Sequence, residues 1–79
     1  MGKINVDRLR VNRAVRLSLL INLDRQPDGQ VLPSAPTFLV VAVSPVSTWE
    51  VYRTKDIADA RAEAIVAARG AGIPFEDLP

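Results

Sequence analysis

The side chains that most often carry out chemistry in proteins are scarce in this sequence. It contains no His and no Cys, so the commonest general base, the commonest metal ligand and every thiolate are missing. A serine nucleophile would need another base to activate it, and no serine here begins a Ser-x-x-Lys motif. The serines considered are Ser18, Ser34, Ser44 and Ser47. We therefore predict that the chain is not an enzyme and holds no cofactor.

Three carboxylates have a spacing that resembles a metal site. Asp56, Asp59 and Glu63 stand at positions i, i+3 and i+7, which places them on one flank of a helix. A hard cation binds such oxygen ligands. Carboxylates near the start of a helix also stabilise it through the helix dipole. We adopt this simpler explanation, so no metal site is predicted.

The basic residues gather in the first third of the sequence. Residues 1–25 hold six basic and two acidic residues, a net charge of +4, whereas residues 26–79 hold four basic and seven acidic residues, a net charge of −3. On a strand, Arg8, Arg10 and Arg16 share one face, because alternate residues point the same way. A row of this kind suits nucleic-acid phosphates. Nucleic-acid binding through these three arginines is therefore the alternative function.

Alternation of apolar and polar residues predicts β-strands. Between residues 9 and 23 nearly every odd position is apolar and most even positions are polar, as in a strand with one buried face. The pattern is longer than a usual strand. We therefore expect a strand over 14–23 and a bend near 10–13, with a short helix over 5–12 as the alternative. Two more strands are predicted over 37–43 and 47–53.

A turn and a helix complete the predicted fold. Residues 26–29 have the Pro and Gly of a type I turn. Residues 55–69 form the helix, which Thr54 caps at its start and Gly72 helps to end. The predicted fold class is α+β: a three-stranded, mostly antiparallel sheet with one C-terminal helix packed on one face, in the order β-β-β-α. We expect a single domain over 1–79.

Apolar residues are in excess for a fold with one helix. Both faces of the strand over 38–43 are apolar, as in a sheet covered on both sides, yet one helix covers one side only. Exposed apolar patches on small proteins mark interfaces, so we predict a partner-binding surface on the uncovered side. In the alternative interpretation, the first residues or the tail over 73–78 fold over this side. The predicted partner-binding residues are Leu20, Tyr52, and whichever of Val40 and Val41 faces away from the helix.

Neither a signal peptide nor a membrane helix is predicted. The first residues are charged, and the longest apolar run is far shorter than the ~20 residues of a membrane helix. We expect a cytoplasmic protein that contacts neither membranes nor a small-molecule substrate. Its predicted function is a small non-enzymatic protein-interaction module that binds another protein or a second copy of itself as a homodimer. By analogy with other short proteins, one form of this function is a phage or mobile-element type inhibitor of a host macromolecular complex.

Overall fold

The computed structural model describes residues 3–22 and 36–78, which form two helices and a four-stranded sheet. The turn predicted at 26–29 and Ser34 lie outside these residues. In chain order the elements are α1 (Val6–Val11), β1 (Arg16–Asn22), β2 (Thr37–Val43), β3 (Thr48–Thr54), α2 (Ile57–Ala71) and β4 (Phe75–Glu76).

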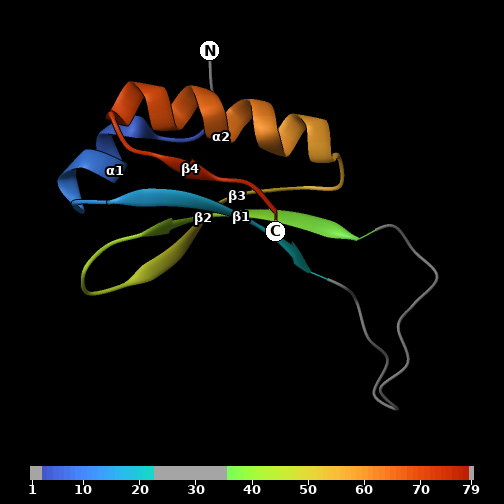
Figure 1. The fold of residues 1–79 in the computed structure, drawn as a ribbon, viewed down its shortest axis with the longest axis horizontal. Helices are drawn as coiled ribbons and strands as arrows, with labels where there is room; N and C mark the ends of the chain where they lie inside the picture. Colours follow the sequence, from blue (N-terminus) through green and yellow to red (C-terminus); the bar gives the residue numbers. More distant parts are fainter. Residues whose placement is uncertain (1–2, 23–35, 79) are drawn as a thin grey trace.

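The strands form one mixed sheet in the order β3-β2-β1-β4. The β1/β2 and β2/β3 pairs are antiparallel, whereas β4 runs parallel to β1. Both helices lie on the same side of this sheet (Figure 1). The predicted α+β fold, with three antiparallel strands and a C-terminal helix packed on one face, is confirmed. The short β4 is an addition that the sequence pattern does not indicate.

At the start of the chain the structure contains the short helix of the alternative prediction and not an extension of the strand. Asn5 caps α1, because its side-chain oxygen accepts a hydrogen bond from the backbone N–H of Arg8 at 3.2 Å. Leu9 is the residue of α1 that is fully buried in the core. After the helix, Arg13 has a φ of 57°. This left-handed conformation turns the chain towards β1.

The C-terminal helix, α2, begins slightly later than predicted and has a different cap. The Asp56 carboxylate accepts a hydrogen bond from the N–H of Ala58 at 2.9 Å, and the Thr54 hydroxyl accepts one from the N–H of Asp56 at 3.2 Å. At the other end, Gly72 has a φ of 70°, which a residue with a side chain rarely adopts. Small side chains face the sheet and let α2 approach it closely. These buried residues are Ala60, Ala64, Ala67 and Ala68.

A β-bulge in β3 changes the side-chain alternation that the sequence predicts. Val40 pairs with Tyr52 and Val41 pairs with Glu50, so one residue of β3 between them has no partner. Trp49, on the other side of the bulge, pairs with Ala42 and also packs against the core beneath the helices. The bulge therefore turns both large aromatic side chains of β3 to the helix side and leaves Glu50 on the other.

Candidate functional site

The candidate site is the side of the sheet that faces away from the helices, called the open face below. Leu20 pairs with Leu39 and Ser18 pairs with Val41 on this side. Leu20 is 45% exposed, whereas Val41 is 9% exposed. No helix or strand in the described part of the chain covers this face (Figure 1). It presents an apolar strip formed by Leu20, Leu39, Val41 and Val43.

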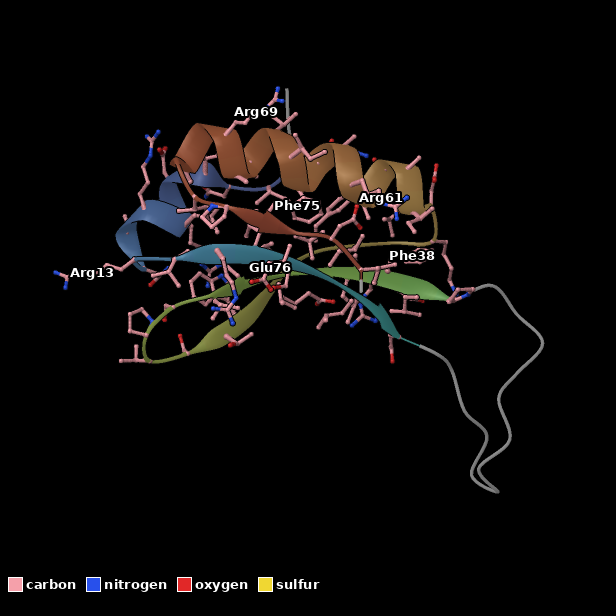
Figure 2. The ribbon with its side chains drawn as sticks, viewed as in Figure 1. Arg13, Phe38, Arg61, Arg69, Phe75 and Glu76 are labelled. Atoms are coloured by element: carbon pink, nitrogen blue, oxygen red, sulfur yellow. The ribbon has the colours of Figure 1, made fainter. Side chains whose placement is uncertain are left out.

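Charged residues border the apolar strip on both sides. On β3, Nε of Arg53 lies 2.8 Å from Oε1 of Glu50. On the opposite border, Nε of Arg16 lies 3.5 Å from Oε1 of Glu76, which is labelled in Figure 2. Ser18 donates a hydrogen bond from its hydroxyl to the same carboxylate at 3.4 Å. An apolar centre inside a polar border is the usual anatomy of a protein interface.

The structure separates the four predicted partner-binding residues. Leu20 and Val41 lie on the open face. Val40 belongs to the core on the helix side and is 0% exposed, so no partner reaches it. Tyr52 is half-buried on the same side. Its predicted position on the open face was wrong, because the bulge shifts the alternation of β3.

The described first residues and β4 lie on the helix side of the sheet and not over the open face, contrary to the alternative interpretation. Phe75 of β4 lies beside Leu17, whose side chain is buried in the core on the helix side. Ile4 and Leu9 are buried in the same core. These segments therefore extend the layer that already contains α2.

An apolar groove continues the open face around the outer edge of β1. It is lined by Leu19, Leu20, Ile21 and Leu78 and has a volume of about 410 Å³. Since β4 pairs with β1 only near its start, the rest of this edge has no strand partner within the described residues. An edge of this kind presents backbone hydrogen-bonding groups to an added strand.

The three arginines of the nucleic-acid alternative do not share one face. Arg8 and Arg10 lie on α1, whereas Arg16 lies on β1. Arg10 donates a hydrogen bond to the carbonyl of Gly70, and its guanidinium lies 3.9 Å from the carboxylate of Asp7. Arg16 belongs to the charged border described above. The prediction that these three arginines share one strand face was therefore wrong, because α1 is a helix. Nucleic-acid binding itself stays a prediction.

A polar cluster that sequence reasoning missed joins the first residues to β3 and α2. Tyr52 donates a hydrogen bond to the Asp59 carboxylate, and Lys3 Nζ donates one to the Tyr52 hydroxyl at 3.5 Å. The backbone N–H of Lys3 also donates to Glu63. Hydrogen bonding to Tyr52 lowers the pKa of Asp59 and raises the pKa of Lys3, and the bond to Asp59 raises the pKa of Tyr52. A phenol with a raised pKa stays protonated, so Tyr52 can donate the hydrogen bond that links β3 to α2.

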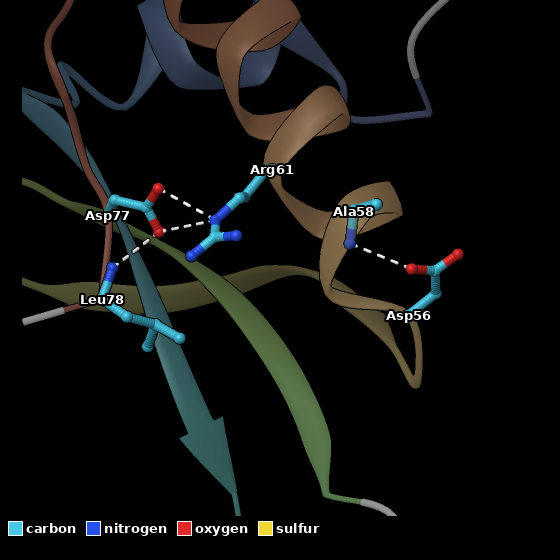
Figure 3. Close-up of polar contacts among 5 residues, drawn as sticks. All are labelled: Asp56, Ala58, Arg61, Asp77 and Leu78. Carbon is cyan, nitrogen blue, oxygen red and sulfur yellow. Dashed lines mark hydrogen bonds and ion pairs between the residues drawn. The ribbon is translucent and has the colours of Figure 1, made fainter.

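A second polar contact holds the tail against α2 (Figure 3). Nε of Arg61 lies 2.9 Å from one carboxylate oxygen of Asp77 and donates a hydrogen bond to the other at 3.0 Å. The backbone N–H of Leu78 donates to the same carboxylate at 2.7 Å. The Leu78 N–H, followed by Arg61, lowers the pKa of Asp77. This contact positions Leu78 beside the apolar groove.

The three carboxylates of the helix flank have separate partners. Asp56 caps α2, Asp59 accepts from β3, and Glu63 accepts from the first residues. In the described ranges, no group of three or more carboxylates is arranged to hold a metal ion. Of the helices in the same ranges, none is both long enough and apolar enough to cross a membrane.

Comparisons with known proteins give no relative from which a function can be transferred. No protein-family model matches the chain. Searches of curated proteins and of solved structures find no significant similarity to it.

Proposed function

We propose that this chain is a non-enzymatic protein-interaction module that docks through its open face, and that its partner is a second copy of the same chain. The observation that carries this proposal is the apolar strip, which no described element covers and in which Leu20 is 45% exposed. Apolar surface left exposed on a small fold is most often an interaction surface.

The charges around the strip favour a second copy. The border contains two arginines and two glutamates, held as two ion pairs, so two such faces meet without net repulsion. A two-fold dimer also needs only one self-complementary patch. Each Å² of apolar surface that the dimer buries contributes about 25 cal/mol before the entropic cost of association. A small domain is only marginally stable, so this contribution supports association.

Sedimentation equilibrium with one variant and one matched control tests the proposal. We expect the wild-type chain to be dimeric at high micromolar concentration and Leu20→Asp to be monomeric, because the substitution places a charge at the most exposed residue of the apolar strip. Val46→Asp, at a residue 92% exposed between β2 and β3, introduces the same charge elsewhere and should leave the dimer intact. A wild-type chain that remains monomeric at this concentration contradicts the proposal.

We also propose a cytoplasmic location. A chain without Cys needs no oxidising compartment to fold. Fractionation of the source cells tests this location, and recovery of the protein outside the cytoplasm contradicts it.

A further inference from the structure

The two sides of the sheet differ in how they are protected against pairing with another chain. The outer strand β3 carries the bulge and the charged residues Glu50 and Arg53, which are devices that natural sheets use against edge-to-edge association. On the other side, β4 pairs with β1 only at Leu17 and Ser18. Beyond them, residues 19–22 of β1 include neither a charged residue nor a proline, and their register with β2 is regular. Within the described residues, this part of β1 is therefore the unprotected edge.

The backbone of this edge directs hydrogen-bonding groups outward. In an antiparallel pair, a residue bonds to the neighbouring strand with both backbone groups or with neither, and the two cases alternate along the strand. Leu17 directs its N–H away from β2, since it donates to the carbonyl of Pro74 at 3.0 Å. By the same alternation, Ile21 directs its N–H and its C=O outward, beyond the residues that β4 pairs with. An added strand can bond to both groups.

We propose that the second copy of the dimer adds this strand: the two β1 strands pair antiparallel at their free edges, with Ile21 of one copy opposite Ile21 of the other across the two-fold axis. The N–H of each Ile21 then donates to the C=O of the other. This inference rests on the proposed function and names the contact that joins the two copies.

The side chains beside the edge suit a second copy. Leu20 is 45% exposed and Ile21 is 48% exposed, and together with Leu78 they line the apolar groove of about 410 Å³. The residues at 19–22 carry no charge, so two copies bring no like charges together along this stretch. Apolar side chains that face each other across paired strands stabilise a sheet. The groove and the edge therefore gain a partner in one step.

Edge pairing and docking of the open faces are compatible in one dimer. Sheets twist and coil, and two sheets joined at an edge can turn their faces towards each other, as they do in orthogonal sandwiches and barrels. Leu20 links the two surfaces, because it belongs to the apolar strip of the open face and also lines the groove. One partner therefore covers both the strip and the edge.

Hydrogen exchange at the Ile21 amide separates edge pairing from face docking alone. Packing of the open faces involves side chains, whereas edge pairing bonds the outward N–H of Ile21. We expect exchange at this amide, read by NMR after quenching, to slow about tenfold or more when the protein is concentrated from low to high micromolar. A wild-type dimer in which the Ile21 amide exchanges at the rate of the monomer overturns edge pairing and leaves the proposed function intact.

A variant on the open face separates the two proposals in the other direction. Leu39 lies on the open face, opposite Leu20, but does not line the groove. A slowed Ile21 amide in a Leu39→Asp dimer as tight as the wild type supports edge pairing and contradicts docking through the open face. A wild-type chain that stays monomeric at high micromolar concentration contradicts both proposals, and the edge would then be left to a strand of another protein.

A charge-swap pair tests whether the two Ile21 residues face each other. Ile21→Lys and Ile21→Glu should each raise the dimer dissociation constant about tenfold or more, because like charges meet across the axis. An equimolar mixture should recover association as a heterodimer, which native mass spectrometry identifies. Val66→Lys and Val66→Glu are the matched controls, at an apolar residue of α2 that is 54% exposed. They should dimerise as the wild type does. A mixture with no preference for the heterodimer overturns the inference.

A proline variant tests the backbone contact independently of charge. Proline is tolerated at an edge position whose N–H points away from the sheet, so Ile21→Pro keeps the hydrogen bonds between β1 and β2 and removes the outward donor. We expect it to weaken the dimer about tenfold, because both symmetry-related hydrogen bonds are lost. An Ile21→Pro dimer as tight as that of the wild type overturns edge pairing.

Discussion

Tyr52 of β3 donates its hydroxyl hydrogen bond to Asp59 of α2, across the boundary between the sheet and the helix. This bond exists because the bulge in β3 turns Tyr52 towards the helix side. The Lys3 ammonium contacts the same hydroxyl, so one phenol links the start of the chain, the sheet and α2.

The first prediction concerns the pH dependence of stability that this link produces. The pKa of Asp59 in the folded protein lies below its ordinary value of 3.8, chiefly because of the Tyr52 hydrogen bond. A lowered carboxyl pKa stabilises the fold above the ordinary value, and this contribution is lost as the pH falls through the folded pKa. Tyr52→Phe should therefore unfold more easily than the wild type near neutral pH.

The difference in stability between Tyr52→Phe and the wild type should shrink at a pH well below 3.8, where Asp59 is protonated. At the alkaline end, the pKa of Tyr52 in the folded protein is raised above 10.0. The protonated phenol therefore stabilises the fold below that pH, and this stabilisation is lost as the pH rises through the raised value. Denaturant midpoints measured across the pH range test both limits. A Tyr52→Phe effect of constant size from acid to neutral pH rules out this account of the link.

The second prediction concerns the close approach of α2 to the sheet. Ala64 is 0% exposed and faces the core, so Ala64→Leu forces extra methylene groups into a packed layer and should cost about 1–3 kcal/mol of unfolding free energy. Ala62 lies on the exposed side of the same helix. Ala62→Leu should change the stability by less than about 0.5 kcal/mol. Urea unfolding measures both, and equal effects of the two variants would contradict the packing described here.

The third prediction concerns the contact that holds β4. Asp77→Ala removes the acceptor of the Arg61 side chain and of the Leu78 N–H, so β4 should open more often. The amide of Leu17 reports this opening, because it donates to the carbonyl of Pro74 at 3.0 Å. We expect hydrogen exchange at Leu17 to accelerate while amides that β1 donates to β2 exchange as before. A uniform acceleration across β1 indicates global destabilisation instead.

Local patterns in the sequence were enough for the three strands, for a helix predicted over 55–69 and found over 57–71, and for the presence of an uncovered apolar side. Each depends on signals a few residues apart. Alternation marks a strand, carboxylates such as Asp56 mark the start of α2, and Gly72 marks its end. The apolar residues on both faces of β2 also indicated correctly that one of them, Val41, lies away from the helices.

The tertiary structure decided which side chains occupy each face. One unpaired residue in β3 moves Tyr52 from the open face to the helix side, and no turn residue in β3 marks this bulge. The first arginines belong to a helix, α1, whose Leu9 side chain is fully buried in the core. The Lys3 side chain meets Tyr52 only because the fold brings the first residues to β3. Periodicity describes neighbours along the chain, whereas these contacts depend on how separate elements pack, and that packing selects the residues a ligand or partner can reach.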